Sequence, residues 1–65
     1  MTQEECQKRV AAIRAVKKDD ERAHGMEDDL WEDVLREIAM GAENARGLAA
    51  KALETKTIKF ARWCS

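Results

Sequence analysis

Apolar residues recur at spacings of three and four along the first eighteen positions, which is the pattern of an amphipathic helix. The stripe consists of Cys6, Val10, Ile13 and Val16 or Lys17. Thr2 and Glu5 precede it at the spacing of a capping box, in which their side chains satisfy N–H groups of the first turn. Two aspartates at positions 19 and 20 end the run. The pattern predicts a helix over 3–18.

A broader apolar stripe follows in the middle of the chain and indicates a helix that faces a core. It consists of Leu30, Trp31, Val34, Leu35 and Ile38, and a longer helix would extend it upstream through positions 27 and 23. Gly41 stands just after it, where a left-handed C-cap residue belongs. Gly25 either interrupts this helix or lies inside one that is capped by Asp19 or Asp20. We expect the longer helix, 20–40, since one interior glycine costs only about 1 kcal/mol.

Small residues dominate the next stripe, and small residues permit close approach between helices. The stripe consists of Ala45, Leu48, Ala49, Ala52 and Leu53. With Glu43 or Asn44 as a cap, the pattern predicts a third helix over 44–54.

The last large apolar side chains lie close together beyond this helix. They fit either a short helix over 56–63 or an extended arm, because aromatic and β-branched residues also favour strands. An isolated strand would have no partner, so we expect the short helix. Aromatic side chains can bury ~150–250 Å² each, so this segment is expected to fold back over the first two helices. The residues expected to do so are Ile58, Phe60 or Ala61, and Trp63.

Composition agrees with a small all-α protein. The chain has 65 residues, about half an ordinary domain, with 38% charged residues, no proline and three glycines. We predict a single helical domain, 1–65, built as a small three-helix bundle with a short C-terminal fourth helix. The length excludes a cleft enzyme with a separate cofactor domain, and the short apolar runs exclude a transmembrane span, so we expect no membrane partner. The first residues lack the apolar stretch of an export signal, so we expect a cytoplasmic protein.

Charge is sorted along the chain. Residues 1–18 carry five bases and two acids, a net +3, and residues 44–65 carry five bases and one acid, a net +4. Residues 19–43 between them carry two bases and ten acids, a net −8. Two interpretations follow: the acidic helix is neutralised by the basic helices on either side, or its charge serves recognition.

Several acids of the middle helix stand four residues apart, and each such like-charged pair weakens a helix by roughly 0.2–0.5 kcal/mol. Binding explains this arrangement better than folding, so we expect an acidic face that recognises a basic patch on a partner protein. The predicted partner-binding residues are Asp28, Asp29, Glu32, Asp33 and Glu37.

Candidate chemistry is sparse. On a continuous helix His24, Glu27, Asp28 and Trp31 share one face, which would suit a metal ligand or a general base. Zinc sites take three or four protein ligands, however, and the chain holds one histidine. We therefore expect His24 to cap or ion-pair, and we predict no metal, no cofactor and no enzymatic activity.

The two cysteines, Cys6 and Cys64, form no metal-binding or redox motif and are expected to act as small hydrophobes. A disulfide that joins the two ends of the bundle is the alternative.

A nucleic-acid interface is a second functional interpretation. The second and third helices with the Gly41 turn could imitate a helix-turn-helix, with Arg46, Lys51 and Lys56 exposed. The acidic second helix would then lie near phosphates, which disfavours this arrangement.

Two stretches, AHGMEDDLWEDVLREIA at 23–39 and ALETKTIKFARWC at 52–64, resemble small helical proteins that bacteriophages and prophages encode. The resemblance implies a viral origin and a bacterial host cytoplasm. It implies no activity and carries over no site residues.

Together these observations predict a non-catalytic, phage-encoded accessory factor that binds a host or viral protein through its acidic helix. The alternative is a small nucleic-acid-associated protein that uses its basic first and third helices. Large apolar side chains are few, so self-association into a homo-oligomer would bury more surface.

Overall fold

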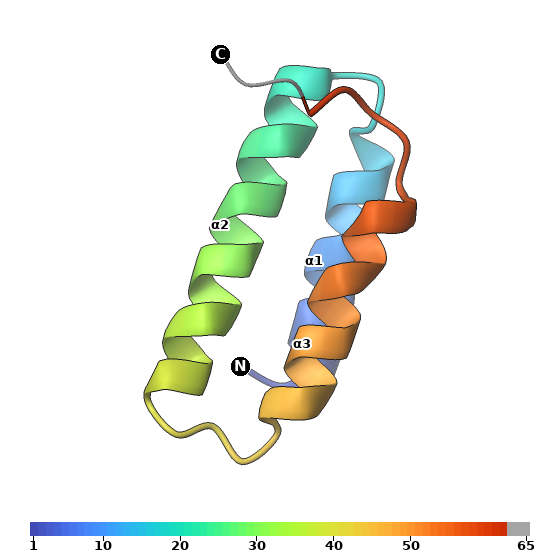
Figure 1. The fold of residues 1–65 in the computed structure, drawn as a ribbon. Helices are drawn as coiled ribbons and strands as arrows, with labels where there is room; N and C mark the ends of the chain where they lie inside the picture. The colour runs from blue at the N-terminus through green and yellow to red at the C-terminus, as the bar shows by residue number, and fades with distance from the viewer. Residues whose placement is uncertain (63–65) are drawn as a thin grey trace.

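Three helices lie side by side in the computed structural model, which describes residues 1–62. They are α1 (Gln3–Ala15), α2 (Asp20–Ala39) and α3 (Ala45–Leu53), and a short 3₁₀ turn, η1 (Glu54–Thr57), continues α3. Figure 1 shows α2 running antiparallel to both α1 and α3. Each helix contacts the other two, and residues 1–62 contain no strand. The predicted all-α class and three-helix bundle are confirmed.

The capping box at the start of α1 is confirmed. The Thr2 hydroxyl accepts a hydrogen bond from the backbone N–H of Glu5 at 3.0 Å, and the Glu5 carboxylate accepts one from the Thr2 N–H at 3.0 Å. The helix ends at Ala15, three residues before the predicted end. From Val16 the backbone bonds shift to the three-residue spacing of a turn, because the chain must reverse before α2.

The longer form of the second helix is also confirmed, and α2 runs through Gly25 without a break. Asp19 caps it, since its carboxylate accepts a hydrogen bond from the Arg22 N–H at 3.1 Å. Beyond the C-terminal end of α2, Gly41 has a φ of +89°, a conformation that a glycine adopts without strain. The local signals thus set both ends of α2.

The predicted helix over 56–63 does not form. The η1 turn ends at Thr57, and the backbone is extended at Ile58, with φ −81° and ψ 127°. The segment up to residue 62 then crosses the end of the bundle where α1 passes into α2 (Figure 1). The physical reason is that an extended segment carries Ile58 into the core, where it is fully buried. Trp63 and Cys64 lie outside the described residues.

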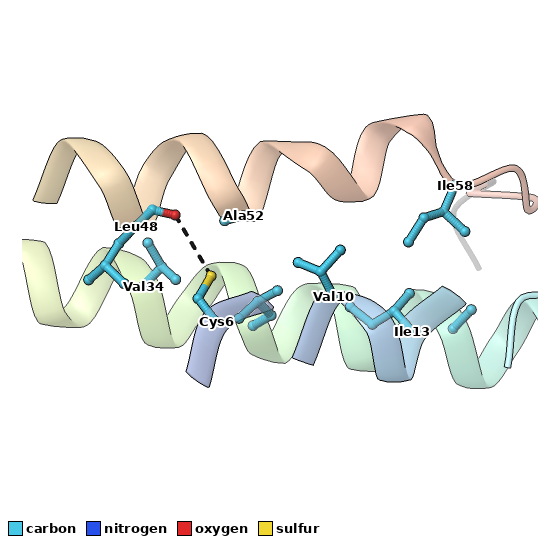
Figure 2. Packing of buried hydrophobic residues seen from close by; sticks show 9 residues of the cluster. Cys6, Val10, Ile13, Val34, Leu48, Ala52 and Ile58 are labelled. Carbon is cyan, nitrogen blue, oxygen red and sulfur yellow. Dashed lines mark hydrogen bonds between the residues drawn. The ribbon is translucent and has the colours of Figure 1, made fainter. Parts of the chain in front are cut away.

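Nine side chains form the hydrophobic core between the three helices. Figure 2 shows α1 residues facing α3, with Ile58 closing one end of the cluster. Four of the largest fully buried side chains are Ile13, Leu30, Leu48 and Ile58. The fold-back predicted for Ile58 is confirmed, and Phe60 packs against the same core. The whole core comprises Cys6, Val10, Ile13, Ala23, Leu30, Val34, Leu48, Ala52 and Ile58.

Replacing Ile58 by alanine should destabilise the bundle strongly. Truncating a buried isoleucine costs about 2–5 kcal/mol, a large share of the roughly 3–10 kcal/mol expected for a domain of this size. Urea unfolding followed by circular dichroism measures the loss. The control is Lys59→Ala on the exposed neighbour, which should change little. Equal unfolding midpoints for the two variants would show that the final segment does not hold the bundle together.

Candidate functional site

Two of the five predicted partner-binding carboxylates are neutralised within the molecule. Asp33 accepts a hydrogen bond from the Arg9 guanidinium of α1 at 2.8 Å. Glu37 pairs with the N-terminal ammonium group of Met1, and the hydrogen bond to Glu37 raises the pKa of that ammonium group. Both residues therefore form their ion pairs on the side of α2 that faces α1. For these positions the structure supports the intramolecular interpretation of the charge pattern.

The other three carboxylates, Asp28, Asp29 and Glu32, are exposed. Asp28 lies 3.5 Å from the His24 imidazole, and Glu32 lies 3.1 Å from the Arg36 guanidinium, so both contacts stay within α2. Within residues 1–62 no base of α1 or α3 forms an ion pair with any of the three. Asp29 lines a small hollow between α1 and α2. Asp28 and Glu32 lie on the side of α2 that carries Leu35.

The four residues that would share one face around His24 do not form a common site. His24 is half-buried and faces Asp28, whereas Glu27 turns into the core and Trp31 turns toward α3. Among residues 1–62 no three His, Cys, Asp or Glu side chains come together in the way that would hold a metal ion. Cys6 is buried, and burial raises the pKa of its thiol.

Glu27 forms a buried ion pair that sequence reasoning did not foresee. Its side chain is only 3% exposed, and the Arg62 guanidinium donates to its two oxygens at 2.8 and 3.0 Å. Arg62 also donates to the backbone carbonyls of Thr55 and Ile58 at 2.7 and 3.0 Å, and it lies over the Phe60 ring, 3.9 Å from its centroid. Position 27 falls in the apolar stripe of α2. A charged residue at such a position was the one sign in the sequence that a buried ion pair would form there.

The environment of Glu27 keeps it ionised. Burial alone would raise the pKa of its carboxyl group, but the hydrogen bonds and positive charge of Arg62, with smaller contributions from Thr55 and Lys56, outweigh burial and lower that pKa. Every buried side-chain nitrogen and oxygen within residues 1–62 has a hydrogen-bond partner. The pair thus holds the final described segment against α2.

An open apolar groove runs between α2 and α3. Its volume is about 200 Å³, and its lining is Trp31, Val34, Leu35, Ile38, Ala49, Ala52 and Leu53. The small side chains of α3 leave this space unfilled. At its borders Leu35 is 66% exposed and Leu53 is 61% exposed. The sequence placed both leucines on core-facing stripes, and this expectation is wrong because the small side chains of α3 leave the space between α2 and α3 open.

Trp31 fixes the position of α3 along α2 beneath the groove. Its indole N–H lies 3.2 Å from the carbonyl oxygen of Ala52 and 3.1 Å from the Thr55 hydroxyl oxygen, and these two acceptors share it. Lys56 lies over the same ring, with its ammonium group 5.8 Å from the ring centroid. This contact places a cation at one end of the groove.

Opposite charges border the two sides of the groove. On α2, Asp28 and Glu32 precede Leu35 by seven and three residues, which places them on the same side of the helix. On α3, Arg46 precedes Leu53 by seven residues, and Lys56 follows at the Trp31 end. The acidic border consists of Asp28 and Glu32, and the basic border of Arg46 and Lys56.

No protein-family model, no curated protein and no solved structure matches this chain. In the part of the chain that the structure describes, no helix combines the length and the apolar character needed to cross a bilayer. The groove and its charged borders are the features on which a function can be argued.

Replacing Arg62 by glutamine should destabilise the protein by about 3 kcal/mol at neutral pH, because Glu27 would be left charged, buried and unpaired. With Arg62 present, the folded-state pKa of Glu27 is lowered, so its stabilising contribution is lost as the pH falls below roughly 4. Without Arg62, burial raises that pKa, and acid relieves the penalty. The deficit of the variant should therefore shrink between pH 7 and pH 3.5.

Urea unfolding of both proteins at the two pH values measures this change. Lys59→Gln removes an exposed cation from the same segment and is the matched control, with little effect expected at either pH. A deficit that stays constant with pH would mean that the Arg62 contact with Glu27 does not carry the effect.

Proposed function

We propose that this chain is a non-catalytic protein-binding factor that works through the surface formed by α2 and α3. The observation that carries the proposal is the apolar groove with Leu35 and Leu53 exposed at its borders, on a protein with a nine-residue apolar core. Small proteins rarely leave such residues together in water unless another molecule covers them. A groove between two helices suits an amphipathic helix of a partner.

The exposed acids of α2 indicate the charge that the partner carries beside its apolar stripe. Asp28 and Glu32 border the groove, and no base of α1 or α3 within residues 1–62 pairs with them. They therefore attract a basic side chain on the partner. Of the five acids predicted to bind a partner, the proposal keeps these two. Asp33 and Glu37 hold the bundle together, and Asp29 lines the hollow between α1 and α2.

The biological setting that we propose is the bacterial cytoplasm, where a phage-encoded accessory factor would bind a host or viral protein. The resemblance of residues 23–39 and 52–64 to phage and prophage proteins supports this setting. Nucleic-acid binding has weaker support, because Lys8, Arg9 and Lys51 each lie in an ion pair with a carboxylate.

Polar substitution of the groove should abolish partner binding without unfolding the protein. Leu35→Gln and Leu53→Gln change exposed side chains, so each should alter stability by no more than about 0.5 kcal/mol. The immobilised chain is tested for the proteins it retains from a bacterial lysate. The matched control is Met40→Gln, since Met40 is 80% exposed but lies outside the groove. The proposal would be contradicted if the two leucine variants still bound the partner and Met40→Gln did not.

Removing the border charge should separate recognition from stability. The double substitution Asp28→Asn with Glu32→Gln should weaken retention of the same partner severalfold and leave melting unchanged or slightly raised. Asp33→Asn breaks the pair with Arg9 instead and should lower stability by up to about 1 kcal/mol, with binding intact. Thermal melting and retention are measured on both variants. If Asp33→Asn weakened binding and the double substitution lowered only stability, α2 would bind through the side that faces α1.

A further inference from the structure

We infer that the occupant of the groove between α2 and α3 is a second copy of this chain, which makes the protein a two-fold symmetric dimer. This inference rests on the proposed function, because it concerns the same surface: in the free protein a second copy covers the groove, and the partner helix takes its place in the complex. Three features of the molecule support a second copy: the opposite charges of the two borders, the level at which each lies along the bundle, and the small size of the core.

The two borders of the groove carry opposite signs. A partner segment that is basic throughout would suit Asp28 and Glu32 on α2 but would be repelled by Arg46 and Lys56 on α3. A second copy presents one acidic and one basic border of its own. A two-fold axis parallel to the helices lays α2 of each copy over α3 of the other, so the acidic Asp28 and the basic Lys56 meet twice. The surface is complementary to itself.

The level of each border along the bundle agrees with this symmetry. The Trp31 contacts with Ala52 and Thr55 set α2 against α3, and Lys56 lies over the Trp31 ring. Asp28 lies about one helical turn before Trp31 and therefore stands near the level of Lys56. A two-fold axis along the helices leaves each level unchanged. Asp28 of one copy consequently comes opposite Lys56 of the second copy.

The apolar surface also fits a second copy. Removing one leucine from a protein core leaves a cavity of about 150 Å³, so the groove of about 200 Å³ has room for a leucine side chain. Leu35 and Leu53 of each copy would cover the groove of the other. A chain of this length buries a smaller fraction of its surface than a larger domain does, and association is a common remedy. Dimerisation thus removes the largest exposed apolar side chains of the groove from water.

Sedimentation velocity of the complete chain across a range of micromolar concentrations tests the inference. The expected result is a species of twice the 7.4 kDa chain mass that dissociates on dilution. Leu35→Glu should raise the dissociation constant at least tenfold, and Met40→Glu, the matched control outside the groove, should leave it unchanged. Circular dichroism confirms that each variant is helical.

A charge exchange tests the orientation of the two copies. Asp28→Lys and Lys56→Glu should each weaken the dimer severalfold, and the two substitutions together should restore it. A dimer that responds to Leu35→Glu but shows no restoration would overturn the two-fold arrangement proposed here. Restoration would support it, because only opposed borders are repaired by the exchange.

The inference and the proposed function fail in different ways. A chain that is monomeric at every concentration overturns the dimer, while the proposed function then stands or falls on the retention experiment with Leu35→Gln. A dimer that is insensitive to Leu35→Glu overturns the inference and shows that association uses another face. Retention of a lysate partner by both leucine variants overturns the proposed function whatever the mass of the free protein.

Discussion

The structure depends on a charged residue in a place where an apolar one would ordinarily stand. Glu27 lies in the core-facing stripe of α2 and is almost fully buried. A buried carboxylate is stable only when a cation is buried beside it and pairs with it. Arg62 supplies that cation from the far end of the described chain and also bonds two backbone carbonyls of its own segment. The pair thus holds the final segment across the end of the bundle, beside the point where Ile58 enters the core.

The small side chains of α3 explain both the close packing of the bundle and its open groove. On the side facing α1, Gly47 leaves room for Gln3, whose side chain occupies the space a Cβ would need. On the side facing α2, Ala49 and Ala52 are too short to fill the space beside Trp31. The same composition that lets helices approach one another thus leaves Leu35 and Leu53 uncovered.

Local signals in the sequence predicted the parts of the fold that local physics determines. The capping box at Thr2, the passage of α2 through Gly25 and the left-handed Gly41 were all readable because each depends on neighbouring residues. The exposure of Leu35 was not, since an apolar stripe does not tell which side chains of another helix will lie opposite it. The Arg62 contact was not either, because Glu27 is thirty-five positions away. Charge sorting anticipated an attraction between α1 and α2, but only the structure showed which acids it uses.

The sequence separation between Glu27 and Arg62 also bears on how the protein assembles. Neighbouring helices of an up-down-up bundle meet after closing short loops, whereas this ion pair closes a loop of thirty-five residues and carries a larger entropic cost. We expect α2 to pack against α1 and against α3 before the final segment docks. In the folded protein the same segment, held by few backbone hydrogen bonds, should open most readily, so its amides should exchange with solvent faster than those of α2.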